Sequence, residues 1–245
     1  MVRHVEYVMG MPISLDLRDE EDLASAVTET FTWLHEVDAR FSPYKVDSEV
    51  SRYGRGLLAA ADLSEELDDV LSRCAYYEDI SGGAFSTQLP GHDFDPCAVV
   101  KGWAVQRAAD HLHAAGARRF CLNAGGDVVT SGEPEPGRAW RVGIRHPEQP
   151  QAVCAVLASR DGTVATSATY ERGAHILDGR TGQPATGLLS VTVVADDLTH
   201  ADALATATFA LGTDGIAWAA TQPGVEVLII DEGRRVHRSP GLTPG

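Results

Sequence analysis

Apolar positions along the chain recur with two different spacings, and the spacing changes from one segment to the next. An alternating pattern over residues 4–17 predicts two short strands, with a turn between them where Gly and Pro occur. Residues 20–40 change to a helical spacing that puts Leu23, Val27 and Phe31 on one face and acidic residues in the first turn. The chain therefore begins with a hairpin followed by an amphipathic helix.

The remaining segments alternate between the two spacings without a strict strand–helix–strand order. Helices are predicted over 64–80, from 98 to about 112, over 198–212 and over 213–221. Strands are predicted at 118–123, 128–130, 140–145, 152–158, 163–166, 174–177, 190–195 and 225–230. Their regular spacing predicts a meander-like antiparallel sheet, and the mixed order of elements indicates the α+β class.

The composition and net charge of the chain exclude some classes of protein. The hydrophobic fraction of 44% and the net charge of −15 are those of a water-soluble globular chain that binds neither nucleic acid nor anionic membranes. The spacing of the four cysteines matches no zinc-binding pattern, and it does not indicate a set of disulfide bonds. With no signal-peptide pattern, no lipidation cysteine and no membrane-length apolar run, we expect a cytoplasmic protein. One domain over residues 1–245 is expected, with 239–245 as a flexible tail rich in Pro and Gly.

The helix predicted at 198–212 carries the first candidate for chemistry. Asp202 and Thr206 are four positions apart, so a carboxylate and a hydroxyl share one face of a helix otherwise rich in Ala. Short oxygen-bearing side chains suit a small hard cation such as Mg²⁺. Thr199 as N-cap with Asp202 three positions later also fits a capping box, in which Asp202 only satisfies backbone amides. Both interpretations are open at this point.

Two further residues attract attention, each with a plainer alternative. Lys101 lies in the first turn of a predicted helix, where the helix dipole disfavours a cation, and this placement indicates either a bound anion or a solvated side chain. Tyr44, in a polar loop, either lies over a flat ligand or packs under the loop.

An ordered set of motifs runs through nearly the whole chain. They include Met9-Gly10, FSPY at 41–44, SGGAF at 81–85, KGWA at 101–104, NAGGD at 123–127, HILD at 175–178 and DALATA at 202–207. Each motif alone is weakly specific, but the ordered set resembles the ApbE-type flavin transferases (FAD:protein FMN transferases). The resemblance favours the metal interpretation of Asp202 and Thr206.

The resemblance implies a single T-fold-like α+β domain that holds FAD between helices and sheet. It implies Mg²⁺ bound by Asp202, Thr206 and the backbone carbonyl of Ala98, with Ala205 adjacent. It implies an FAD site lined by Met9, Tyr44, Ala84, Phe85, Ser86, Asp95, Lys101 and Ile176. Ser86, where the family commonly has Asp, and the sequence Asp95-Pro96-Cys97 depart from the usual pattern.

The implied reaction moves the FMN part of FAD onto a Ser or Thr hydroxyl of an acceptor protein and releases AMP. Asp202 would act at the reacting phosphate, and His175 is the candidate base because an unperturbed imidazole titrates near pH 6.5, with ligand orientation as its alternative role. Two other functions use the same residues: an Mg²⁺-dependent FAD pyrophosphatase with water as acceptor, and a carrier that binds FAD without chemistry.

Overall fold

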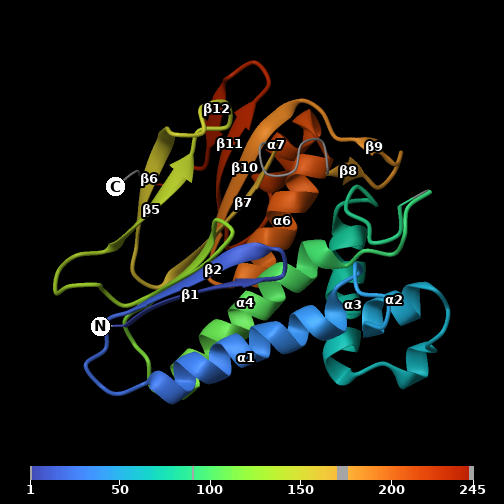
Figure 1. Ribbon diagram of the computed structural model, residues 1–245. Helices are drawn as coiled ribbons and strands as arrows, with labels where there is room; N and C mark the ends of the chain where they lie inside the picture. The colour runs from blue at the N-terminus through green and yellow to red at the C-terminus, as the bar shows by residue number, and fades with distance from the viewer. Residues whose placement is uncertain (1, 90, 170–175, 243–245) are drawn as a thin grey trace.

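In the computed structural model, which describes residues 2–89, 91–169 and 176–242, one large sheet and a layer of helices pack face to face (Figure 1). The strands are β1 (Val2–Val8), β2 (Met11–Leu17), β3 (Phe120–Ala124), β4 (Asp127–Ser131), β5 (Trp140–Arg145), β6 (Val153–Ser159), β7 (Gly162–Ala168), β8 (Leu177–Asp178), β9 (Gln183–Pro184), β10 (Leu188–Ala195), β11 (Glu226–Asp231) and β12 (Val236–Arg238). The helices are α1 (Ala24–Phe41), α2 (Glu49–Gly54), α3 (Glu65–Ile80), α4 (Cys97–Ala114), α6 (Leu198–Ala210) and α7 (Thr213–Ala219), with a 3₁₀ turn at Ala60–Asp62.

Eight strands form the main sheet in the order β1-β2-β3-β4-β7-β10-β11-β12, and every neighbouring pair is antiparallel. The predicted α+β class is therefore confirmed. The predicted meander-like single sheet is wrong at two places: within the described residues, β5 pairs only with β6, and β8 pairs only with β9. β4 pairs directly with β7, with Val128 opposite Val164. The β5–β6 hairpin lies over these strands and buries Val142, Ile144 and Leu157 against them.

The first two strands form a hairpin through a two-residue turn. Met9 and Gly10 both have positive φ, at 53° and 75°, and Val8 is paired with Met11. Two consecutive positive φ angles are typical of the type I′ turn, whose twist matches that of the flanking strands. The expected hairpin is confirmed, and Met9 occupies a conformation that few residues other than Gly adopt.

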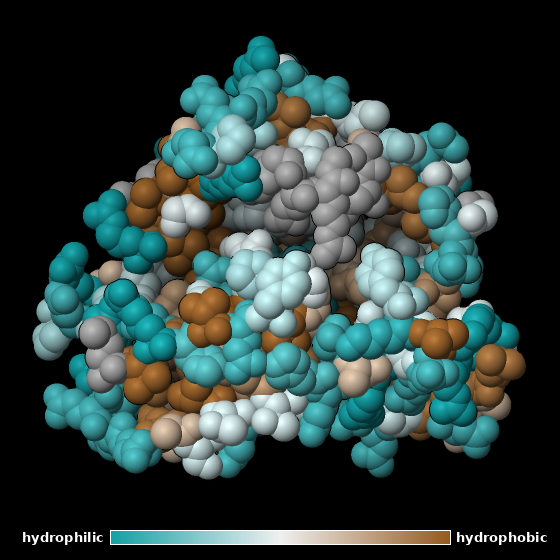
Figure 2. Space-filling view, viewed as in Figure 1, coloured by the Kyte–Doolittle hydropathy of each residue, from teal (hydrophilic) through white to brown (hydrophobic). Residues whose placement is uncertain are grey.

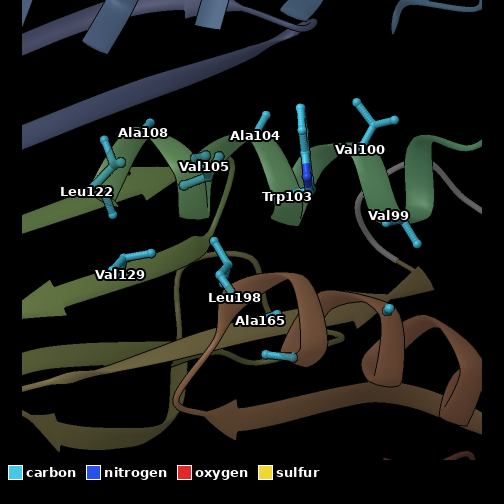
Figure 3. Packing of buried hydrophobic residues seen from close by; sticks show 14 of the residues in the cluster. Val99, Val100, Trp103, Ala104, Val105, Ala108, Leu122, Val129, Ala165 and Leu198 are labelled. Atoms are coloured by element: carbon cyan, nitrogen blue, oxygen red, sulfur yellow. The ribbon is translucent and has the colours of Figure 1, made fainter. Parts of the chain in front are cut away.

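The main core lies between the inner face of the sheet and helices α1, α4 and α6. Figure 3 shows side chains from α4, including Trp103 and Val105, gathered with Leu122 and Val129 of the sheet and with Leu198 of α6. α6 lies between α4 and strands β7 and β10, and its residues are buried on nearly every side. A helix that is apolar all round belongs in a protein interior, so a carboxylate on it needs partners within the fold.

The start of one helix and the N-cap of another differ from the predicted ones. α1 begins at Ala24 rather than at residue 20, because the Asp22 carboxylate accepts the Ala24 N–H and the acidic residues precede the helix. α6 begins at Leu198, and its N-cap is Asp197, whose carboxylate accepts the His200 N–H at 2.9 Å. Thr199 therefore lies inside the first turn and is not the cap.

The C-terminal residues up to 242 pack against the sheet. The Ser239 hydroxyl accepts the Val227 N–H at 2.9 Å, and the Leu242 side chain is 8% exposed among the residues beneath β5 and β6. The part of the predicted tail that is described is thus held by contacts. Among the described residues, no helix has the length and apolar character needed to cross a membrane.

Candidate functional site

The candidate site forms where α4 and α6 approach each other most closely. Gly102 lies at this point, and a Cβ placed on it would be 2.8 Å from the Asp202 Cβ and 2.8 Å from the Leu198 carbonyl oxygen. No other residue fits there without separating the helices. The Gly102 N–H donates to Asp202 Oδ2 at 2.9 Å, across 100 positions of sequence. Sequence reasoning quoted Gly102 within a motif but gave it no role.

Asp202 is a buried acid that binds α4 and does not cap its own helix. Its side chain is 3% exposed, and Oδ1 lies 3.2 Å from Lys101 Nζ. The capping-box interpretation is therefore wrong. In a regular helix the Gly102 N–H would donate to the Ala98 carbonyl, so the Asp202 carboxylate competes with that carbonyl for its donor.

Lys101 also reaches a second buried acid. Its Nζ lies 2.6 Å from Asp127 Oδ2, and the Asp127 side chain is 2% exposed. Asp127 begins β4 directly after the turn at Gly125 and Gly126, and its Oδ1 accepts the Thr166 N–H at 3.0 Å. From the sequence, the motif at 123–127 indicates a hairpin turn or a close approach to a ligand. Its last residue in fact supplies the second carboxylate of the site.

The charges of this group do not balance. Two buried carboxylates, Asp127 and Asp202, face the single ammonium of Lys101, and Lys101 is one quarter exposed. Burial, reinforced by the nearby charge of Asp127, raises the pKa of the Asp202 carboxyl above its ordinary value, while Lys101 acts in the opposite direction. Among the described residues, buried Asp127 Oδ2 finds no hydrogen bond of regular geometry, although it forms the ion pair with Lys101. An additional cation at this position would balance the negative charge and would give Asp127 Oδ2 another partner.

Hydroxyl groups lie next to the carboxylates. Thr206 is one helical turn beyond Asp202, and its Oγ1 is 3.3 Å from the Ser167 hydroxyl on β7. Ala205 is fully buried beside it. The described residues hold no group of three His, Cys, Asp or Glu side chains arranged around a metal. Mg²⁺ is commonly held by one or two carboxylates together with phosphate oxygens of a substrate, so this donor set fits Mg²⁺ better than a metal that needs a complete protein cage.

The glycine-rich segment predicted to line the flavin packs tightly against the loop around residue 179. A Cβ on Gly179 would lie about 2.3 Å from the Gly83 carbonyl oxygen, and the Gly179 N–H donates to the Ala84 carbonyl at 2.8 Å. Ala84 and Phe85 are 0% and 2% exposed, so their side chains belong to the interior. Ser86 bonds within its own loop to the backbone of residue 88.

The other predicted flavin-lining residues are scattered around this region in different environments. Met9, in the β1–β2 turn, and Ile176 are partly buried against the main core. Tyr44 is 78% exposed, so the alternative of an aromatic ring packed under its loop is wrong. The Asp95 carboxylate accepts the Cys97 N–H at 2.8 Å at the start of α4. His175 lies outside the described residues.

Comparison with known proteins was made on both sequence and structure. The sequence model of the ApbE family matches residues 9–89 and 86–229. The chain is 29% identical over 178 residues to an FAD:protein FMN transferase of Vibrio cholerae, covering 67% of this chain and 53% of that protein. It is 34% identical over 211 residues to one of Treponema pallidum, covering 75% and 58%. The chain thus spans about half the length of these curated relatives.

Solved structures match over almost the whole chain. The flavin transferase ApbE of Vibrio cholerae superposes with a TM-score of 0.85 at 22% identity, covering 98% of this chain and 97% of that one. The ApbE protein of Thermotoga maritima superposes with a TM-score of 0.86 at 22% identity, with 98% and 97% covered. These matches establish the fold, and the sequence model matches well over half of the chain. The chain is a member of the ApbE family.

Proposed function

We propose that this protein transfers the FMN part of FAD to a Ser or Thr hydroxyl of an acceptor protein. The hydroxyl oxygen forms a bond to the phosphorus on the FMN side. The bond from that phosphorus to the bridging oxygen breaks, AMP leaves with the bridging oxygen, and the hydroxyl proton is lost to a base. Family membership and the names of the relatives support this reaction.

The observation that carries the proposal is the buried group of Lys101, Asp127 and Asp202 where α4, α6 and β4 meet. Buried charges are costly unless they are paired and hydrogen-bonded, and here two buried carboxylates share one ammonium. A flavin carrier needs no such group, whereas a site for a metal-bound diphosphate does.

Asp202, Thr206 and the Ala98 carbonyl, beside Ala205, would hold Mg²⁺. Bound there, Mg²⁺ would neutralise the diphosphate and polarise the phosphorus that is attacked. Competition between Asp202 and the Ala98 carbonyl for the Gly102 N–H supports that carbonyl as a ligand, since it weakens its helical hydrogen bond.

The chain's own residues position the reactants. Asp127 and Asp202 together fix the Lys101 ammonium, and Lys101 would bind a phosphate oxygen of FAD. His175 is the proposed base for the attacking hydroxyl. The flavin would lie along residues 84–86, with Met9, Tyr44, Asp95 and Ile176 at its margins.

The test incubates the purified protein with FAD and Mg²⁺, with and without an acceptor domain, and measures AMP together with covalent flavin fluorescence on a denaturing gel. We expect AMP and a fluorescent acceptor band only when the acceptor is present, and neither with an acceptor whose target hydroxyl residue is replaced by Ala. AMP without acceptor would instead identify a pyrophosphatase. FAD that stays intact with an acceptor flavinylated by a curated relative would refute the transferase and favour a carrier.

A further inference from the structure

The two edges of the eight-stranded sheet differ in length and in protection. β12 at one edge has three residues, whereas β1 at the other has seven and pairs with β2 without a bulge. Proteins usually shorten, bend or cover an exposed edge strand, because its free backbone groups attract other strands. β1 has no Pro, no Lys and no irregularity in its pairing. It is a full-length edge that nothing in the described part of the chain covers.

The hairpin fixes which backbone groups of β1 face outward. Val8 and Met11 flank a two-residue turn and therefore form a hydrogen-bonded pair, and such pairs alternate along the hairpin. The N–H and C=O groups of Arg3, Val5 and Tyr7 consequently point away from β2. Within the described residues, β1 has β2 as its only strand neighbour.

Strand β1 also exposes apolar side chains. Val2, Val5 and Tyr7 are 41%, 64% and 72% exposed. Figure 2, which has the orientation of Figure 1, shows hydrophobic residues among hydrophilic ones at several places on this face, including the region where β1 and β2 run. Exposed apolar side chains on an unpaired edge strand make a surface suited to another strand.

The sequence of β1, Val-Arg-His-Val-Glu-Tyr-Val, is complementary to itself when reversed. We propose that a second copy of this chain pairs with it through antiparallel β1 strands, with Val5 on the two-fold axis. Val5 then faces Val5 of the second copy, Arg3 faces Tyr7, and His4 faces Glu6, each of the last two pairs occurring twice. Cation–aromatic cross-strand pairs such as that of Arg3 with Tyr7 stabilise antiparallel strands. The dimer has a self-complementary interface, as two-fold symmetry requires.

The helix beneath β1 permits this approach. The His35 side chain of α1 forms a hydrogen bond of 2.6 Å with the Glu6 side chain of β1. The side of α1 that carries His35 therefore lies next to this edge strand. Thr28, Thr32 and Ala39 share that side by helical spacing, and all three are exposed and uncharged. In a sheet that continues across a two-fold axis, the two α1 helices lie on the same face and meet through these small residues.

Sedimentation velocity from micromolar to near-millimolar concentration tests the proposal on the intact chain. We expect a concentration-dependent dimer for the wild type and self-association weakened about tenfold or more by Val5→Lys, since two like charges then lie opposite each other. Val236→Lys is the matched control, because Val236 is 60% exposed on the opposite edge strand. A wild type that stays monomeric, or a dimer equally sensitive to both variants, would overturn the proposal.

Cysteine cross-linking tests the register in a Cys154→Ser background, since Cys154 is the exposed native cysteine. Val5→Cys lies on the axis and is expected to form a disulfide with its own copy, because directly opposite residues are within disulfide reach. Arg3→Cys and Tyr7→Cys are expected to cross-link when mixed and much less when alone. Cross-linking of Tyr7→Cys with itself in preference to Arg3→Cys would exclude this register.

Discussion

The close approach of α4 and α6 at Gly102 leads to a sharp prediction for Gly102→Ala. A new Cβ would lie 2.8 Å from Asp202 Cβ and 2.8 Å from the Leu198 carbonyl oxygen, and ordinary contact begins at 3.4 Å. Both atoms belong to or adjoin the α6 backbone, so relief requires a helix shift of roughly 0.6 Å. Overpacking of this kind costs about 1–3 kcal/mol, and the better helix propensity of Ala returns about 1 kcal/mol.

The expected net loss of folding stability is therefore small, about 0–2 kcal/mol, whereas the loss of function is large. The shift would displace Asp202 from Lys101 and weaken the Gly102 hydrogen bond, and misplacements near 1 Å cost up to about 100-fold in rate. Urea unfolding measures the stability. Flavin transfer and the Mg²⁺-induced rise in Tm measure the site.

Gly143→Ala is the control, because its Cβ would meet only the Val153 side chain at 3.6 Å, an ordinary contact. It should leave both readouts close to wild type. If Gly102→Ala kept the wild-type transfer rate and the wild-type Tm response to Mg²⁺, close packing at this position would not be what assembles the site, and the reasoning would fail.

Three further predictions concern aspartate side chains. Asp202→Ala should abolish the Mg²⁺-dependent rise in Tm as well as transfer, and a retained Tm response would contradict Asp202 as a ligand. Asp127→Asn should destabilise the fold by roughly 1–3 kcal/mol in urea unfolding, because it removes a buried partner of Lys101. The hydrogen bond from His237 holds the pKa of Asp231 well below its ordinary value. Asp231→Asn should therefore lower the free energy of unfolding at neutral pH. Urea unfolding at a series of pH values should show the difference between variant and wild type shrinking as the pH falls below about 4. A difference that stays constant with pH would refute this prediction.

The elements that could be predicted from the sequence are those fixed by local signals. The β1–β2 hairpin follows from its alternation and its turn, and α3 begins at its predicted cap, where Ser64 accepts the Leu67 N–H. The β5–β6 hairpin was placed correctly along the chain but assigned to the wrong sheet. Local pattern predicts a strand, but its neighbour depends on contacts between distant segments.

The candidate site also depends on contacts between distant segments, which local sequence does not predict. Thr199 and Asp202 fit a capping box as well as a metal site, and local sequence does not separate the two. What decides against the cap is the Gly102 N–H, which is 100 residues away along the chain. The role of Asp127 cannot be predicted from the sequence for a related reason, since its ion pair with Lys101 arises only when β4 packs beneath α4.

The connection between β2 and β3 has a consequence for how the protein folds. Leu17 and Phe120 are paired neighbours in the sheet, yet α1 to α4 all lie between them in sequence. Closing so long a connection carries a large entropic cost before any contact repays it, and pairings of this kind form slowly. The β1–β2 hairpin can form early by itself, but it pairs with β3 only after the helices have packed together. Fragments that end before β3 should therefore be unable to bind flavin, and refolding should regain binding only in its last phase.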